Sequence, residues 1–273
     1  MLVEKITSRQ NPLVKRFRRV RAGGDRAYVF LEGIRLIEEA LEAGVRFDVI
    51  AFTSALEAHD RGLSLIDSLR SVPCRGANVS EQVMKSMADT ETPQGVAAIV
   101  SRPFFRLADV FEPLTFIVIA DGLQDPGNLG TLIRTSEAVG ASAFITTRNT
   151  VDPFNQKALR ASMGSAMRLP IAVAARSKEI VSSCKEHGIR VIATRPARPS
   201  AAGEETRLYV ETDFSGRFAL ALGGEAEGLT AELAAAATEF VSIPMSPQVE
   251  SLNVAAAGAI VLYEAARQRG FKF

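Results

Sequence analysis

The chain has 273 residues, of which 47% are hydrophobic and 23% are charged, and its formal net charge is +1. This balance is typical of a folded globular protein and excludes intrinsic disorder as the main state of the chain. The basic N-terminus has no apolar run behind it, so we expect neither a signal peptide nor a membrane span. Two isolated cysteines fit the reducing cytoplasm, and together with two isolated histidines they predict no metal site.

The basic residues are concentrated near the N-terminus. Residues 1–35 hold nine Lys and Arg against three Asp and Glu, an excess of +6 in a chain of +1. Such an end indicates a polyanionic partner, most simply RNA, although a solvated basic helix face explains it equally well. The chain has no Trp, so no base-stacking platform is evident. The candidate RNA contacts are Arg16, Arg18, Arg19 and Arg35.

The first hundred residues alternate between short strand and helix patterns. Apolar runs predict strands over residues 28–31, 47–53 and 95–100, and helical spacing predicts helices over 34–43, 63–69 and 81–87. Prolines interrupt the pattern after this stretch, which places a domain boundary between residues 101 and 113. We therefore expect a smaller N-terminal α/β domain at residues 1–105 and a second domain at 113–273.

The second half alternates again. Strands are predicted over 115–120, 143–146, 170–174, 190–194, 218–222 and 240–243, and helices over 129–139, 154–161, 178–187, 231–236 and 252–267. This order predicts an α/β fold with a mostly parallel sheet covered on both faces. Ligands bind such sheets at the carboxyl ends of the strands. The turns after residues 120, 194, 222 and 243 are therefore the candidate sites.

The turn after residue 120 reads Asp-Gly-Leu-Gln-Asp-Pro-Gly-Asn-Leu-Gly. Pro126 and Gly127 predict a tight turn, and Asn128 is a candidate N-cap for the next helix. Arg134 then lies on the second turn of that helix. Taken alone, the segment is explained equally well as a catalytic turn and as a capped connection between a strand and a helix that carries an exposed arginine.

The turn after residue 222 is rich in glycine but does not fit a nucleotide-phosphate loop. A dinucleotide fingerprint that starts at Gly223 needs glycine where Glu225 stands, and a P-loop needs lysine where Leu229 follows Gly228. This spacing disfavours a nicotinamide-dependent oxidoreductase. The turn suits a ligand with hydroxyl or ammonium groups, or an uncharged ring packed on backbone. The alternative is a helix N-terminus with favourable acids in its first turn.

The turn after residue 243 is bounded by proline and leads into an alanine-rich helix. Ser251 is a candidate N-cap, and Asn253 is polar among apolar neighbours in the first helical turn. The helix that follows has one long apolar face. A helix-end hydrogen-bonding role explains both polar residues as well as a binding role does.

Three motifs in order carry a resemblance. Residues 125–130 (Asp-Pro-Gly-Asn-Leu-Gly) with Arg134, residues 223–225 (Gly-Gly-Glu) with 228–229, and residues 243–245 (Ile-Pro-Met) with 250–254 resemble the motifs of SpoU-type RNA ribose 2′-O-methyltransferases of the SPOUT class. The likeness covers residues 115–273, and Gly224 departs from it, since Asn, Ser or Ala is common there. Residues 32–35 (Glu-Gly-Ile-Arg) resemble the ribosomal-protein-like RNA-binding domain of such enzymes.

The resemblance implies a trefoil knot in the C-terminal domain, S-adenosylmethionine as methyl donor, and a homodimer. It implies that backbone groups hold the cofactor, and a Cβ at Gly223 would then intrude where backbone approaches ligand. The cofactor-binding positions are Thr194, Leu222, Gly223, Gly224, Ile243, Met245 and Leu252.

The resemblance also places Arg134 at the reacting hydroxyl, surrounded by Asn128, Glu225, Ser251 and Asn253. Because an arginine keeps its proton at ordinary pH, we expect Arg134 to pair with phosphate and stabilise the alkoxide rather than act as a base. Glu225 would orient Arg134 or the polar cluster. The N-terminal domain favours ribosomal RNA as the substrate. The alternatives are a transfer RNA methyltransferase and a non-catalytic RNA-binding protein of the same fold.

Overall fold

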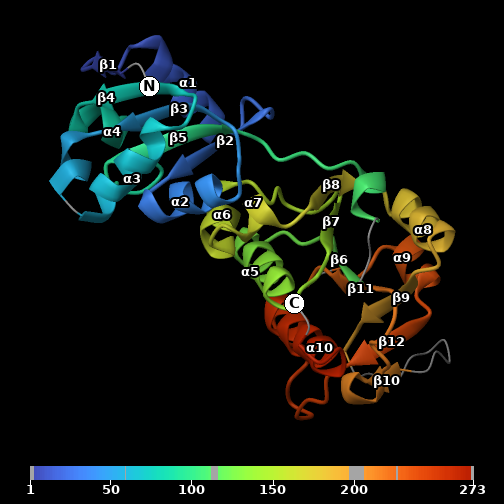
Figure 1. Ribbon diagram of the computed structural model, residues 1–273. Coiled ribbons are helices and arrows are strands. Elements are labelled where there is room, and N and C mark those ends of the chain that lie inside the picture. Colours follow the sequence, from blue (N-terminus) through green and yellow to red (C-terminus); the bar gives the residue numbers. More distant parts are fainter. Residues whose placement is uncertain (1–2, 59, 112–115, 197–205, 226, 272–273) are drawn as a thin grey trace. The chain divides into compact units, whose positions relative to one another are not determined.

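The computed structural model describes residues 3–271, apart from residues 59, 112–115, 197–205 and 226 (Figure 1). The chain divides into two compact units: Met1–Pro103 with Phe154–Gln156, and Phe104–Pro153 with Lys157–Phe273. The first long segment ends within the interval where the boundary was expected. The predicted start of the second domain at residue 113, and Thr115 at the start of a predicted strand, lie outside the described residues.

The first unit is built on a five-stranded mixed sheet with the order β1-β4-β3-β5-β2. β5 runs antiparallel to β2 and β3, whereas β4 runs parallel to β1 and β3. The sequence did not predict β1 and β4, because both are short and carry charged or polar residues. The elements are β1 (Val3–Ile6), α1 (Pro12–Arg21), β2 (Tyr28–Glu32), α2 (Ile34–Glu42), β3 (Phe47–Phe52), α3 (Asp60–Arg70), β4 (Arg75–Val79), α4 (Glu81–Met87) and β5 (Val96–Ser101).

Helix α1 shows how the basic N-terminal segment folds. The side chain of Asn11 accepts a hydrogen bond from the N–H of Leu13, and Pro12 occupies the first helical turn, which is a favourable start for a helix. One face of α1 is buried, and its Phe17 ring packs edge-on against Phe30 of β2 at 6.2 Å. The basic residues of α1 lie on the faces of the helix that are not buried.

The second unit is built on a seven-stranded, wholly parallel sheet with the order β10-β12-β9-β11-β6-β7-β8. This confirms the predicted α/β class. Among the described elements of this unit, β10, the short α7 and the 3-10 helices at Leu107–Val110 and Tyr209–Glu211 were not predicted. The strands are β6 (Phe116–Asp121), β7 (Ala143–Thr147), β8 (Ile171–Ala175), β9 (Arg190–Thr194), β10 (Thr206–Leu208), β11 (Phe218–Gly223) and β12 (Glu239–Ser242).

Helices cover both faces of this sheet. Ile117, Ile119 and Ala221 share a buried cluster with Ile180 of α8 and Leu233 of α9. Leu222, whose side chain points the opposite way, meets α10 on the other face, where α10 lies beside α5 (Figure 1). The helices are α5 (Pro126–Ala138), α6 (Gln156–Ser162), α7 (Ser165–Arg168), α8 (Ser177–Glu186), α9 (Ala231–Ala236) and α10 (Val254–Gln268).

Close packing at Gly258 fixes α10 against α5. A Cβ at this position would lie 2.5 Å from a methyl group of Leu132 of α5 and 3.1 Å from one of Leu222 of β11, so a larger residue would require these side chains to shift. The contact brings the start of α10 near the start of α5, which positions the polar residues at both helix ends. No helix in the described part of the chain is long and apolar enough to cross a membrane.

Candidate active site

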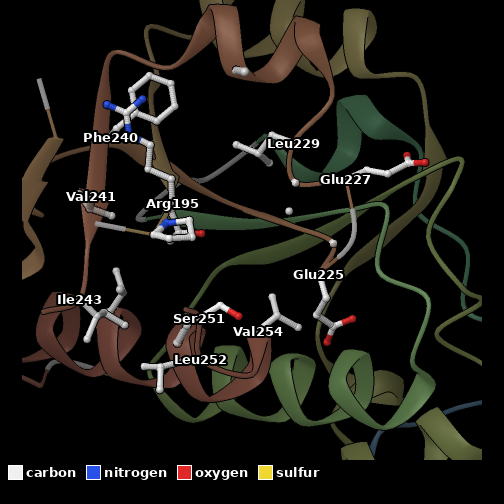
Figure 2. A pocket seen from close by; sticks show the side chains of 18 of the residues that line it. Arg195, Glu225, Glu227, Leu229, Phe240, Val241, Ile243, Ser251, Leu252 and Val254 are labelled. Atoms are coloured by element: carbon white, nitrogen blue, oxygen red, sulfur yellow. The ribbon is translucent and has the colours of Figure 1, made fainter. Parts of the chain in front are cut away.

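Four parallel strands carry the candidate turns to one edge of the sheet. Gly223 of β11 is in register with Asp121 of β6, and Val241 of β12 is in register with Thr194 of β9. The edge holds a cavity of about 470 Å³, at the ends of β9, β11 and β12 and at the start of α10 (Figure 2). Of the predicted site residues, those that line it are Thr194, Gly223, Gly224, Glu225, Ile243, Met245, Ser251 and Leu252.

The other predicted residues lie around the cavity rather than in its wall. Leu222 is fully buried, so its side chain belongs to the packing between sheet and helix. Asn128 and Asn253 form a polar cluster beside the cavity, and Arg134 lies exposed on α5. The sequence missed Arg195, Phe240 and several apolar lining residues, although Arg195 directly follows the predicted Thr194.

The loop that follows β11 is tied down by its own backbone and by Asp121. The N–H of Gly224 donates to the carbonyl of Asp121 at 2.8 Å, and the N–H of Thr230 donates to the Asp121 carboxylate at 2.6 Å. Within the loop, the N–H of Gly228 donates to the carbonyl of Gly224 at 2.9 Å. Asp121 is fully buried. Asp121 therefore anchors both ends of the loop that lines the cavity, one end through its backbone carbonyl and the other through its buried carboxylate.

The glycine requirement at residue 223 has a different reason from the one expected. A Cβ on Gly223 would lie 2.4 Å from the carbonyl carbon of Gly228 and 2.6 Å from the nitrogen of Leu229. The clash is therefore with the loop itself, and the expectation of an intrusion into ligand space was wrong about the atoms involved. Gly224 is equally confined, because its Cβ would lie 2.5 Å from the carbonyl oxygen of Gly122.

The cavity walls fit S-adenosylmethionine by size and chemistry. A volume near 470 Å³ is ordinary for a small-molecule site. Ile243, Leu252 and Val254 form an apolar wall suited to an uncharged ring (Figure 2), and the acidic residues Glu225 and Glu227 also belong to the lining. These carboxylates suit a ligand that carries sulfonium and ammonium charge and no phosphate.

Arg195 stands at the opposite wall from this apolar group (Figure 2). Its guanidinium lies 4.0 Å from the centre of the Phe240 ring, and its Nε donates to the hydroxyl of Thr206 at 2.6 Å. A stacked and hydrogen-bonded arginine is held in one orientation. Arg195 is therefore a fixed cation at the cavity wall, suited to a carboxylate of a ligand.

A chain of hydrogen bonds joins the three motifs beside the cavity. The amide of Asn128 donates to the carboxylate of Glu225 at 2.5 Å, and the amide of Asn253 donates to the side-chain oxygen of Asn128 at 2.9 Å. The oxygen of Asn253 accepts from the N–H groups of Ala255 and Ala256. Asn253 is thus the N-cap of α10, and the alternative reading of Ser251 as the cap is wrong.

The start of α5 also differs from the expectation. Its N-cap is Asp125, whose carboxylate accepts from the N–H of Asn128 at 2.8 Å, so Asn128 lies inside the helix and its side chain is free for the polar chain. Lys157 lies 2.6 Å from the same carboxylate. The hydrogen bond from Lys157, helped by the N–H of Asn128, holds the pKa of Asp125 below its ordinary value.

Arg134 is exposed on α5, and it has no hydrogen bond or ion pair with any other residue of the described chain. The carboxylate of Glu225 accepts a hydrogen bond from Asn128. Of the two partners expected for Glu225, which were Arg134 and the polar cluster, the structure therefore shows the polar cluster. The guanidinium of Arg134 is therefore available to an anionic group from outside the subunit. Among the described residues, no group of His, Cys, Asp and Glu side chains could hold a metal ion.

Two of the four arginines predicted to contact RNA are engaged within the first unit. Arg16 lies 2.5 Å from the carboxylate of Asp48 and stacks on a tyrosine ring, and the Nε of Arg18 donates to the carbonyl of Ser86 at the end of α4. Arg19 and Arg35 keep 61% and 58% of their side chains exposed, beside more distant carboxylates. Arg16 and Arg18 therefore have structural contacts that a bound RNA would have to replace.

Comparison with known proteins identifies the family. Residues 115–263 match the SpoU rRNA Methylase family, and residues 11–98 match the MRM3-like substrate binding domain. The 23S rRNA guanosine 2′-O-methyltransferase RlmP of Bacillus subtilis is 32% identical, over 96% of this chain and 98% of RlmP. An uncharacterized tRNA/rRNA methyltransferase of Synechocystis is 36% identical, over 98% and 95% of the two chains.

Solved structures agree over nearly the whole length. An rRNA methyltransferase from Sinorhizobium meliloti with bound AdoMet has a TM-score of 0.83 and 31% identity, over 97% of this chain and 98% of that one. The SpoU methyltransferase AviRb from Streptomyces viridochromogenes, in complex with AdoMet, has a TM-score of 0.82 and 26% identity, over 95% and 98%. The predicted resemblance, enzyme class and cofactor are thus confirmed. The chain belongs to the SpoU rRNA methylase family and is a methyltransferase whose methyl donor is S-adenosylmethionine.

Proposed function

We propose that this methyltransferase methylates the ribose 2′-hydroxyl of a guanosine in the ribosomal RNA of the large subunit. The relatives that match nearly the whole chain carry this activity in their names. The match of residues 11–98 to a substrate binding domain supports an RNA-binding role for the first unit. The observation that carries the proposal is the polar chain of Glu225, Asn128 and Asn253 beside the cavity, because it joins all three motifs at one place.

In this proposal each wall of the cavity binds a different part of the cofactor. S-adenosylmethionine supplies an electrophilic methyl group on a positively charged sulfur. The apolar side chains of Ile243, Leu252 and Val254 would hold the uncharged ring, and Arg195 would hold a carboxylate. Glu225 would supply a negative charge to the cations of the donor. The anchored loop after β11 keeps these groups in position, which is the main requirement of a displacement reaction.

Arg134 and the polar chain act on the ribose. The attacking 2′-oxygen gains negative charge as its proton leaves, and a fixed guanidinium lowers the energy of that charge. Arg134 has no hydrogen bond or ion pair among the described residues, so it can contact the neighbouring phosphate and the developing alkoxide together. Because arginine holds its proton, water or the phosphate accepts the proton of the hydroxyl. Asn128, Ser251 and Asn253 orient the ribose.

The proposal includes a homodimer formed through the second unit, a trefoil knot in that unit, and a cytoplasmic location. Support for the dimer comes from α10, where Tyr263 is 50% exposed and Ile260 is 36% exposed within residues 254–263, a stretch without charged side chains. An exposed apolar face of this kind is typical of a subunit interface. The knot rests on membership of the family, since the C-terminal motifs match it in order.

Mapping of 2′-O-methyl groups tests the function directly. Total RNA from a strain that lacks the gene is compared with RNA from the same strain complemented with the wild-type gene or with Arg134→Ala. We expect one guanosine of 23S rRNA to lose its methyl group without the gene and to regain it with the wild type only. Methylation that changes in transfer RNA instead would support the alternative substrate. An unchanged map in all strains would contradict the proposal.

A further inference from the structure

A second cavity lies at the same edge of the parallel sheet, beyond β7 and β8. It has a volume of about 290 Å³, and we call it the basic pocket. Basic side chains come from the residue after each strand and from the start of α8, and one acid, Glu232, is also present. The pocket is lined by Thr147, Arg148, Asn149, Ala175, Arg176, Ser177, Lys178, Thr230 and Glu232.

The basic pocket carries a net positive charge. Arg148 and Lys178 are exposed, and neither has an ion pair with any residue in the described part of the chain. Arg176 has one long contact, 3.7 Å to Glu179, and both side chains are more than half exposed. With Glu232 and Glu179 counted against the three cations, the local charge is still positive. The hydroxyl-bearing residues Thr147, Ser177 and Thr230 add possible donors, so the pocket suits an oxyanion.

The backbone is distorted in a way that brings two of the arginines together. Ala174 has a φ of +57°, which a residue with a Cβ rarely adopts because the Cβ crowds the following carbonyl oxygen. The register between β7 and β8 shifts at this point, so that Thr147 pairs with Ala175. The residues that follow this pair are Arg148 and Arg176. Because neighbouring strands lie about 4.8 Å apart, the shift sets the two arginines side by side at the sheet edge.

The basic pocket and the cofactor cavity share a wall. Leu229 lines the cofactor cavity, and the next residue, Thr230, lines the basic pocket. The hydroxyl of Thr230 lies 3.1 Å from that of Ser177 at the start of α8. The loop that lines the cofactor cavity therefore continues directly into the wall of the basic pocket. Helix α8 also directs its N-terminal dipole there, which favours an anion.

We propose that the basic pocket binds a backbone phosphate of the RNA substrate, through Arg148, Arg176 and Lys178. The proposal rests on the proposed function for the identity of that RNA. Through this pocket the second unit binds the RNA substrate independently of the first unit, close to the reacting ribose. The pocket sets which phosphate lies at the sheet edge and reads no base.

Charge removal at two residues tests the assignment. The variants are Arg148→Gln, Lys178→Gln and the double variant. Lys185→Gln is the matched control, because Lys185 is exposed on the same helix and does not line the pocket. Binding of a 23S rRNA transcript is measured at several salt concentrations, the KM for the transcript and kcat are measured in the methylation assay, and S-adenosylmethionine affinity is measured by calorimetry.

For the double variant we expect a KM for RNA raised on the order of tenfold or more, with kcat within twofold of the wild type and cofactor affinity unchanged. The slope of the logarithm of the RNA binding constant against the logarithm of the salt concentration should fall by about 0.7–0.9, the change for one lost phosphate contact. Lys185→Gln should leave both values unchanged. A wild-type KM and salt slope in the double variant would overturn the proposal.

Three further outcomes separate this proposal from the proposed function or refute it. If wild-type protein fails to methylate the 23S transcript, the proposed function fails, and the salt slope with total cellular RNA still decides whether the pocket holds a phosphate. A second outcome is that the double variant lowers kcat or cofactor affinity while the KM for RNA stays unchanged. In that case Arg148 and Lys178 act only by positioning the loop after β11, and the phosphate site is refuted. Binding of inorganic phosphate with no effect on RNA affinity would refute it as well.

Discussion

Substitution of Gly223 by alanine probes the loop that holds the cofactor. The added methyl group would lie 2.4 Å from the carbonyl carbon of Gly228, whereas ordinary contacts of a Cβ begin near 3.4 Å. The neighbouring atom is backbone and cannot rotate away as the end of a side chain can. Gly228 and Leu229 must therefore move by about 1 Å, and both line the cofactor cavity.

The expected size of the effect follows from this displacement. Overpacking of a close contact costs about 1–3 kcal/mol. A loop that shifts to relieve the clash has to be forced back before the cofactor can bind, so the cost appears in the binding constant. Since 1.4 kcal/mol corresponds to tenfold, we expect S-adenosylmethionine affinity to fall on the order of 5- to 150-fold. If the loop does not move far enough to relieve the clash, the remaining strain destabilises the folded protein and lowers its melting temperature.

Calorimetric titration with S-adenosylmethionine and thermal unfolding measure the two parts. Gly188→Ala is the matched control, because Gly188 has a φ of +61° with open space around its Cβ. It should lower the melting temperature through backbone strain and leave cofactor affinity unchanged. If Gly223→Ala keeps both wild-type affinity and wild-type melting temperature, the argument from the Gly228 contact is refuted.

Four other predictions follow from single contacts. Arg134→Ala should lower turnover on the order of a hundredfold at unchanged cofactor affinity, and strong rescue by Arg134→Lys at raised pH would instead indicate a general base. Asp121→Ala should weaken cofactor binding and lower stability by about 1–3 kcal/mol, because the N–H of Thr230 loses its buried acceptor; Asp121→Asn, which keeps an acceptor, should lose less. Hydrogen bonding from Arg267 lowers the pKa of Glu264 from 4.5 to about 2, so its contribution to stability is complete above pH 4.5 and is lost as pH falls towards 2; Glu264→Gln should flatten an acid-unfolding curve over that range, and an unchanged curve would contradict this. Burial raises the pKa of the Cys184 thiol to about 12, so a thiol reagent should label it only on unfolding, as mass spectrometry can check.

The sequence alone determined the elements whose signal is local. The continuous apolar run before Asp121 predicted a buried strand, and the structure has β6 there, within one residue of the expected end. The order of the three motifs was sufficient to indicate the family and the cofactor, because each motif is a short run with its own turn chemistry. Strands β1 and β4 were missed because four or five residues with charged side chains carry too little periodicity.

The tertiary structure alone decided which side chains meet. β12 lies between β10 and β9, and this order brings Phe240 under Arg195, although they are far apart in the chain. Whether Arg16 of helix α1 was free for RNA depended on Asp48, which comes from strand β3. The basic pocket depends on a register shift between β7 and β8, and the sequence of neither strand predicts this shift. Contacts of this kind arise from strand order and register, and a one-dimensional pattern does not contain them.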